Sequence, residues 1–142
     1  MKTSIRKLLL FLCFVFVGAA LYGFYLFNKR PADIRKSAAS YSLSADSLLH
    51  IYDKDEARAN KQFLNEVIAV SGVVSRVIIG PARDQATVML STIDPLEGVT
   101  CSFYDDQADA LKKVQQGQEI TVKGVCTGKL MDVVLNKCSI QN

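Results

Sequence analysis

A run of twenty uncharged residues near the N-terminus, residues 8–27, constrains this chain more than any other feature of its sequence. A helix of this length, rising about 1.5 Å per residue, spans about 30 Å, the thickness of the hydrocarbon core of a bilayer. A lone span in lipid must be helical, because its backbone hydrogen bonds have to be satisfied internally. Basic residues precede the run, and aromatic residues crowd its far end, where an interfacial belt lies. The sequence therefore predicts a short basic N-terminus (1–7) followed by a transmembrane anchor (8–27).

This segment has two alternative interpretations, a cleaved signal peptide and a lipid-modified cysteine. A cleaved signal peptide also begins with positive charge and ends at small residues, and Gly18-Ala19-Ala20 would suit such a cleavage site. The apolar run continues beyond Ala20 to Phe27, which favours a retained anchor, although cleavage stays open. Cys13 follows Leu12, whereas a lipid-modified cysteine follows a small residue, so lipidation is disfavoured.

Charge distinguishes the anchor flanks from the rest of the chain. Residues 1–37 hold seven of the 17 Lys and Arg residues and one of the 14 acidic ones, which leaves ten basic and thirteen acidic residues in 38–142. The basic flanks suit anionic headgroups, so membrane lipid is one expected partner. A nucleic-acid-binding surface normally carries a basic excess, which makes nucleic acid an unfavoured but not excluded ligand.

Beyond the anchor, the pattern predicts a polar stalk (28–43) and one domain (44–142). Ser44 can cap a helix that apolar spacing predicts over 45–60. A long run of β-branched residues, interrupted at Gly72, predicts a bent strand over 67–79. Alternation and turn residues predict further strands at 86–90, 99–104, 119–126 and 133–140, with a helix over 105–114.

Gly72 and Gly124 lie in matching contexts, Val-Ser-Gly-Val and Val-Lys-Gly-Val. Strands bent at glycine suit a small closed barrel, in which one strand serves both halves of a curled sheet. Five strands with a helix between the third and fourth is the arrangement of the OB-fold. The expected fold is therefore mainly β with helices: an N-terminal transmembrane helix and a five-stranded OB-like barrel with a leading helix.

The same residues carry a family resemblance, which covers 44–140. Its pieces are a leading helix ending in Ala57 to Phe63, Val70-Ser71-Gly72-Val73-Val74, Val99-Thr100-Cys101-Ser102-Phe103, the stretch from Gly117 to Gly128, and Val134 to Ile140. With these pieces the chain resembles the OB-fold family named for its similarity to tRNA-anticodon-binding domains, which occurs in bacterial envelope proteins and lipoproteins. The resemblance implies a bacterial envelope protein but assigns no biochemical role, because fold alone does not determine function.

Three cysteines fall in the expected domain: Cys101, Cys126 and Cys138. None belongs to a C-x-x-C pair, so neither a zinc ribbon nor a thioredoxin-type site is indicated. Cysteines of small domains outside the cytosol usually form disulfides, which favours a periplasmic domain with a cytoplasmic N-terminus. In an OB barrel the fourth and fifth strands are antiparallel neighbours, so a Cys126–Cys138 bridge is expected, with Cys101 as rival partner; three buried free thiols are the alternative.

Catalytic and metal-binding signals are weak. His50 is the single histidine, and Asp53-x-Asp55 resembles the start of a calcium loop except that Arg58 stands where that loop requires glycine. No nucleophile elbow, metalloprotease, P-loop or dinucleotide motif occurs. We therefore expect no enzyme, metal or cofactor.

The expected function is that of a non-catalytic binding or interaction module of the cell envelope, whose partner is an envelope protein, a peptide or an oligosaccharide. OB barrels bind through the face of strands two and three and the adjoining loops. The alternative is a single-stranded oligonucleotide on that face, which requires aromatic stacking on a basic surface. The candidate residues of the binding face are Arg76, Arg83, Thr87, Met89, Ser102, Tyr104 and Lys123.

Overall fold

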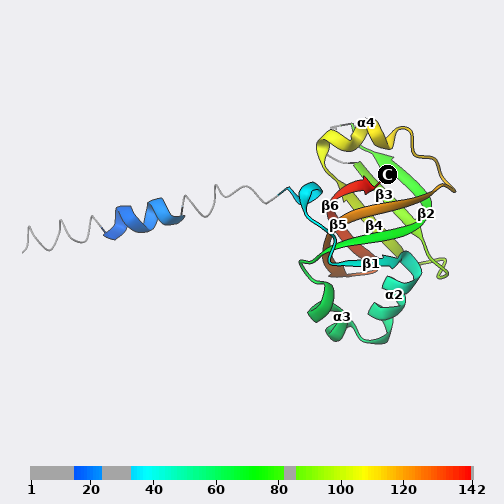
Figure 1. Ribbon diagram of the computed structural model, residues 1–142, viewed down its shortest axis with the longest axis horizontal. Helices are drawn as coiled ribbons and strands as arrows, with labels where there is room; N and C mark the ends of the chain where they lie inside the picture. The colour runs from blue at the N-terminus through cyan, green and yellow to red at the C-terminus, as the bar shows by residue number, and fades with distance from the viewer. Residues whose placement is uncertain (1–14, 24–32, 82–85, 142) are drawn as a thin grey trace, which may run out of the picture. The chain divides into compact units, whose positions relative to one another are not determined.

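The computed structural model describes residues 15–23, 33–81 and 86–141 (Figure 1). The chain divides into two compact units, Met1–Ala32 and Asp33–Asn142.

In the first unit, residues 15–23 are helical and leave large apolar side chains such as Phe16 and Tyr22 exposed. None of the described helices is both long and apolar enough to cross a bilayer. The predicted span extends to residues 8–14 and 24–27, which lie outside the described residues.

The second unit contains the predicted five-stranded closed barrel, which is confirmed (Figure 1). The strands follow one another around the barrel in the order β2-β3-β4-β6-β5, and β5 pairs again with β2 to close it. All neighbours are antiparallel except β4 and β6, which are parallel. The strands are β2 (Val67–Ile79), β3 (Ala86–Ser91), β4 (Gly98–Phe103), β5 (Glu119–Lys129) and β6 (Val133–Gln141).

The strand β2 belongs to both halves of the barrel. Its first half pairs with β5 and its second half with β3, and Val73 takes part in both pairings. A Cβ atom on the neighbouring Gly72 would lie 3.1 Å from the Cβ of Ala45 and 3.3 Å from the Cβ of Leu90. Glycine at this bend therefore lets the helical layer and β3 pack closely against the curved strand.

Two helices cover one end of the barrel, where a single helix over 45–60 was expected. The helix α2 (Ala45–Lys54) begins after Ser44, whose side chain caps it as predicted by accepting from the amide of Ser47 at 3.1 Å. Asp55 has extended backbone angles and ends α2, and its carboxylate accepts from the amide of Arg58 at 3.0 Å to cap α3 (Glu56–Phe63). An aspartate that bonds the backbone locally competes with helix continuation, which explains the break.

The core joins these helices to the barrel interior. Tyr52 of α2 and Phe63 of α3 are fully buried, and their rings lie 6.3 Å apart. They pack in one hydrophobic cluster with the inward-facing strand residues, among them Val70, Val88 and Leu135. The helices are thus part of the folding unit rather than an appendage.

Residues that were expected to form a polar stalk are in part structured. A short 3₁₀ helix, η1 (Ile34–Lys36), is followed by β1 (Tyr41–Ser44), which pairs in parallel with the start of β2. After β4, a 3₁₀ turn, η2 (Asp105–Gln107), and one turn of helix, α4 (Ala108–Leu111), stand where a longer helix was expected.

Candidate functional site

The outer face of β2, β3 and β4 gathers four of the predicted binding-face residues. Arg76 lies opposite Met89 on the neighbouring strand, and Thr87 lies opposite Ser102. Arg76 is exposed, and the other three are half-buried. Arg83 falls outside the described residues. Ligand binding by this face stays a prediction.

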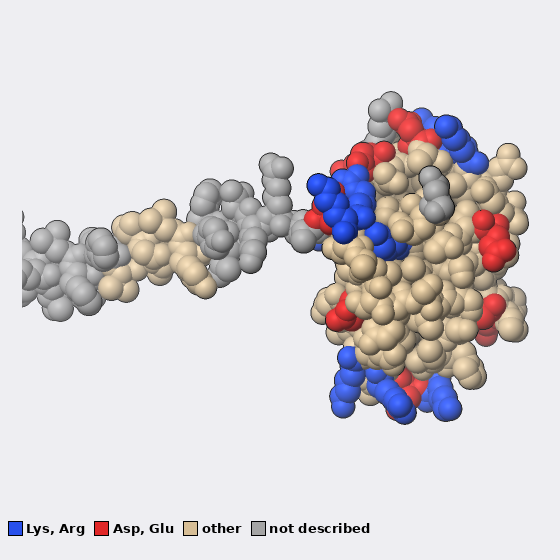
Figure 2. Space-filling view, viewed as in Figure 1, with Lys and Arg blue, Asp and Glu red and all other residues tan. Residues whose placement is uncertain are grey.

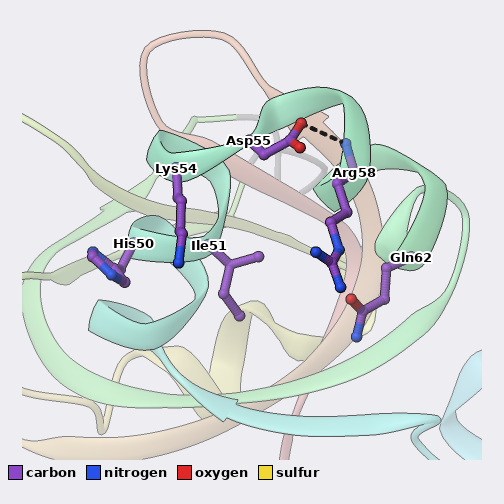
Figure 3. A pocket seen from close by; sticks show the side chains of 6 residues that line it. All are labelled: His50, Ile51, Lys54, Asp55, Arg58 and Gln62. Atoms are coloured by element: carbon purple, nitrogen blue, oxygen red, sulfur yellow. Dashed lines mark hydrogen bonds between the residues drawn. The ribbon is translucent and has the colours of Figure 1, made fainter.

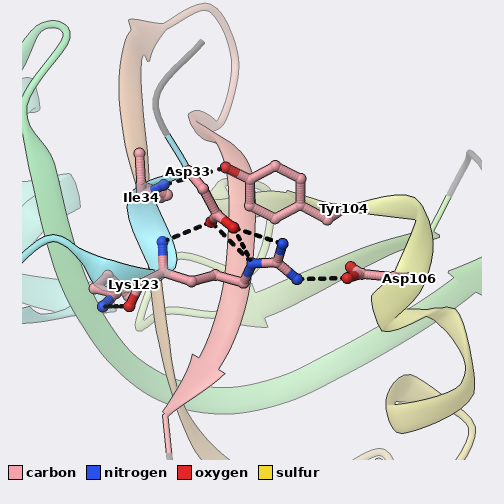
Figure 4. A network of polar contacts seen from close by, with 6 residues as sticks. Asp33, Ile34, Tyr104, Asp106 and Lys123 are labelled. Carbon is pink, nitrogen blue, oxygen red and sulfur yellow. Dashed lines mark hydrogen bonds and ion pairs between the residues drawn. The ribbon is translucent and has the colours of Figure 1, made fainter. Parts of the chain in front are cut away.

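The other two candidates lie outside these three strands: Tyr104 follows β4 and Lys123 belongs to β5, and both bind η1 (Figure 4). Lys123 is only 7 % exposed. Its Nζ donates to the carbonyl of Arg35 at 3.0 Å and to that of Ser37 at 2.9 Å. A buried ammonium group therefore satisfies its hydrogen bonds with the backbone of the segment that precedes the barrel.

Arg35 completes this arrangement. Its guanidinium group lies 4.9 Å from the centroid of the Tyr104 ring, pairs with Asp33 at 2.6 Å, and pairs also with Asp106. The hydrogen bonds from Arg35 lower the pKa of Asp33 to about 2. The amide of Ile34 donates to the Tyr104 hydroxyl at 3.4 Å.

We call this group the η1 clamp; it consists of Asp33, Arg35, Tyr104, Asp106 and Lys123. Because the guanidinium covers the tyrosine ring, that ring is engaged within the domain instead of presenting an open stacking surface. Sequence reasoning placed the tyrosine and the lysine on a ligand face and missed the other three residues.

The expected disulfide is wrong. Cys101, Cys126 and Cys138 are free, buried thiols, and the expected Cys126–Cys138 bridge is not formed. Cys126 lies opposite Leu135 across the β5–β6 pair, and its sulfur is 3.3 Å from the hydroxyl of Tyr52. Leu135 stands three positions before Cys138 on β6, so the two cysteines are not cross-strand partners.

Cys138 approaches the rival partner instead. It lies opposite Phe103 on β4, the strand that also carries Cys101. Burial, and then the interaction with the Cys101 thiol, raises the pKa of Cys138. Burial likewise raises the pKa of Tyr52, with a further contribution from its hydrogen bond to Cys126. These thiols behave as small apolar groups of the core.

Two connections meet at one end of the barrel, loop 92–97 between β3 and β4 and turn 130–132 between β5 and β6. Asp132 accepts from the amide of Gly98 at 2.9 Å and from the hydroxyl of Thr100 at 2.8 Å. Lys129 pairs with Glu97 at 2.5 Å. These contacts hold the two connections together.

Four large apolar side chains on these connections are strongly exposed. We call them the barrel-end surface: Ile93 (90 % exposed), Leu96 (83 %), Leu130 (92 %) and Met131 (75 %). Single exposed apolar residues are ordinary, but their concentration on two joined connections is typical of an interaction site.

Carboxylates accompany the barrel-end surface. Asp46 of α2 accepts from the amide of Ile93 at 2.6 Å, and Asp94 accepts from that of Leu96 at 2.8 Å. With Asp53 they line a hollow of about 390 Å³ beside Ile93. Lys129, which lies among these carboxylates, donates hydrogen bonds to Asp53 and to Glu97, and these bonds, that to Asp53 first, raise the pKa of Lys129. The five carboxylates of this end are Asp46, Asp53, Asp94, Glu97 and Asp132.

A second hollow, of about 430 Å³, lies between α2 and α3 (Figure 3). His50 and Lys54 line it from α2, and Arg58 and Gln62 line it from α3, with half-buried Ile51 between the helices. His50 was considered only as a catalytic residue in the sequence, and this grouping depends on the break at Asp55. In the part of the chain that the structure describes, no group of His, Cys, Asp and Glu is arranged to hold a metal.

Comparisons with known proteins identify the family of the fold. The structure is similar to a "putative nucleic acid-binding lipoprotein" of Klebsiella pneumoniae subsp. pneumoniae MGH 78578, with a TM-score of 0.60 and 15% identity over 80% of this chain and 100% of that one. A "putative aspartyl-tRNA synthetase" of Leishmania major Friedlin matches more weakly, with a TM-score of 0.49 and 12% identity over 74% of this chain and 21% of that one.

At 15% identity the likeness to the Klebsiella protein concerns the fold alone. No curated protein matches the sequence. The family model of the tRNA_anti-like proteins matches residues 1–140. The order of the strands around the barrel, the bent β2 and this match lead to one conclusion: the chain belongs to the tRNA_anti-like family.

Proposed function

We propose that this protein is a non-catalytic binding module of the cell envelope, whose barrel-end surface takes up a segment of a partner protein that combines apolar and basic side chains. The observation that carries the proposal is the exposure of Ile93, Leu96, Leu130 and Met131 on two connections joined by hydrogen bonds and an ion pair. Burying an aliphatic side chain contributes about 1.5–3 kcal/mol, so such a surface can supply most of a moderate affinity.

The charges beside this surface specify the partner. Five carboxylates and one lysine lie on the connections and on the adjoining part of α2. Complementary charges guide encounter and exclude wrong partners, so basic side chains on the partner fit this end and acidic ones do not. An anionic lipid surface would be repelled for the same reason. A protein segment with Lys or Arg beside Leu or Ile meets both requirements.

The location forms part of the same proposal. The uncharged run 8–27 would hold the chain in a bacterial membrane with its N-terminus in the cytoplasm and the domain in the periplasm. The exposed apolar side chains of the helix at 15–23 support contact with lipid. A reporter fused after Asn142 tests it: we expect alkaline phosphatase activity, and a reporter active only in the cytoplasm would contradict the periplasmic location.

An oligonucleotide ligand is the second candidate. It is supported by the family and by the description of the Klebsiella lipoprotein as nucleic acid-binding. Against it, the one aromatic residue in β3 and β4 is Phe103, which is buried, and the ring of Tyr104 lies under Arg35. Stacking of bases on exposed aromatic rings contributes much of the affinity for single strands.

Peptide binding tests the proposal on the full chain in phosphatidylcholine nanodiscs. The probes are three fluorescein-labelled peptides of alternating residues: Lys with Leu, Glu with Leu, and Lys with Ser. We expect the Lys–Leu peptide to bind at least about tenfold more tightly than the others, because a tenfold difference needs only about 1.4 kcal/mol. The double variant Leu96→Ser/Met131→Ser should lose this preference.

Ile78→Ser provides the matched control, because Ile78 is an exposed apolar residue of β2 away from the barrel end. It should bind the Lys–Leu peptide as the wild type does. Equal binding of all three peptides, or equal binding by the double variant, would overturn the proposal. Salt-dependent binding of labelled oligothymidylate without any Lys–Leu binding would favour the nucleic-acid alternative.

A further inference from the structure

The hollow between α2 and α3 has the donors of an anion site, and we propose that it binds a phosphate group. His50, Lys54, Arg58 and Gln62 line it; in Figure 3 Lys54, Arg58 and Gln62 extend to the same side of the helix pair, and His50 lies at the edge of the group. Its volume of about 430 Å³ is that of a site for a small molecule or a headgroup. This inference does not rest on the barrel-end surface, although His50 also lines the hollow beside Ile93.

The local sequence explains why these four side chains meet. Residues four apart on a helix lie one above the other, so His50 and Lys54 form one pair on α2, and Arg58 and Gln62 form another on α3. The break at Asp55 turns the second helix so that the two pairs border one hollow. On one continuous helix, the four side chains would lie in a single row along the helix surface instead of facing each other across a hollow.

The hollow carries two positively charged side chains, Lys54 and Arg58, and one carboxylate. Asp55 is its one acidic lining residue, and its carboxylate accepts from the amide of Arg58 to cap α3. Among the described residues, the ion pairs are made by Arg35, Lys112 and Lys129. Lys54 and Arg58 therefore reach the hollow without a carboxylate partner from the described chain. In Figure 2, Lys and Arg atoms gather over the end of the domain formed by α2 and α3, at the bottom of the view.

The mixture of donors suits phosphate. A guanidinium fork binds two oxygens of an oxyanion side by side, and an ammonium group supplies a compact charge to a third. The imidazole of His50 and the amide of Gln62 add further N–H donors. Half-buried Ile51 gives the hollow an apolar part that would contact the carbon atoms of a phosphate ester. Both a lipid headgroup and a soluble phosphate ester carry this group.

The single histidine makes the site directly observable. His50 is the only histidine in the chain, so without a purification tag its imidazole C–H signal is unique in an NMR spectrum. The full chain in maltoside micelles is titrated with inorganic phosphate, and separately with sodium chloride at equal ionic strength and pH. We expect a saturable shift of this signal with phosphate, at a dissociation constant of about 1 mM, and no saturation with chloride.

Variants locate the effect. The double variant Lys54→Gln/Arg58→Gln should bind phosphate at least about tenfold more weakly than the wild type. The single variant Arg58→Lys should keep part of the wild-type affinity, because it keeps the charge but loses the guanidinium fork. Lys61→Gln removes one positive charge from α3, as Arg58→Gln does, at a residue that does not line the hollow, and this variant should bind phosphate as the wild type does. The backbone amide spectrum of each variant reports that it is folded.

Two further titrations identify the source of the phosphate. One uses glycerol 3-phosphate, and the other uses short-chain phosphatidylglycerol added to the micelles, with phosphatidylcholine as its control. Saturation with the soluble phosphates supports the site with a soluble ligand, and saturation with phosphatidylglycerol alone supports it with a lipid headgroup. A shift that never saturates, or one that Lys54→Gln/Arg58→Gln leaves unchanged, overturns the proposal.

Discussion

Replacing Lys123 by methionine should detach η1 while leaving the barrel folded. The side chain is 7 % exposed and donates to the carbonyls of Arg35 and Ser37 at 3.0 and 2.9 Å. Methionine has a similar volume and fills the same space, but it donates no hydrogen bond. The change therefore removes the central contact of the η1 clamp and preserves packing.

The magnitude follows from these two bonds. Each hydrogen bond from a charged donor contributes about 1.5–3 kcal/mol, but both carbonyls belong to exposed residues and regain bonds to water. We therefore expect the free energy of local opening to fall by about 2–3 kcal/mol. The free energy of unfolding of the barrel should change by less than about 1 kcal/mol, because replacing a buried charge by an apolar side chain often leaves stability unchanged.

Hydrogen exchange measured by NMR on the full chain resolves the two effects. The amide of Ser37 donates to Ile34 within η1, whereas the amide of Ser40 donates to Val67 in β2. In Lys123→Met the Ser37 amide should exchange about 30- to 150-fold faster, as the 2–3 kcal/mol implies. The Ser40 amide should keep its rate.

Lys129→Met is the matched control, because it removes a partly buried lysine from the opposite network of Asp53 and Glu97. It should leave the Ser37 amide unaffected. If Lys123→Met left Ser37 exchange unchanged, or accelerated Ser37 and Ser40 equally, the reasoning about the η1 clamp would be refuted.

Three further outcomes are expected. Gly124→Ala should lower the free energy of unfolding in urea by about 1–3 kcal/mol, because its Cβ would lie 2.5 Å from the sulfur of Cys138. Cys138→Ala should restore part of this loss, and strict additivity would argue against the contact. The three domain thiols are buried and should react with a thiol reagent only after unfolding; rapid labelling of the native protein would contradict their burial. The pKa of Asp33 is lowered to about 2 by Arg35, so its stabilisation of the η1 clamp is present above about pH 4 and lost as the pH falls toward 2. Exchange of the Ser37 amide should report this loss, and Asp33→Asn should remove the pH dependence.

The barrel could be predicted because its signals are local. Ser44 lies directly before the helix that it caps, and Gly72 lies next to the residue at which β2 changes partner. The four residues of β1 carry no comparable signal, because a short strand with polar ends resembles a linker. The break at Asp55 depends on competition between a side chain and the helix backbone, which apolar spacing does not reveal.

The site residues were harder to predict, because they depend on register and on distant contacts. That β5 and β6 are antiparallel neighbours was predicted, but not their register, which places Cys126 opposite Leu135, three positions before Cys138. Arg35 and Asp106 are separated by 71 positions, and no spacing rule relates them. The barrel-end surface likewise arises only when two connections meet in the closed barrel.

The most direct test of the barrel-end surface identifies the residues at which a peptide binds. The Lys–Leu peptide is added to the isotope-labelled full chain, and the backbone amide shifts are followed by NMR. We predict the largest shifts in residues 92–98 and 129–133, with saturation at one common dissociation constant. Shifts centred on Thr87 and Ser102 of the outer barrel face, or no saturable shift at all, would contradict the account.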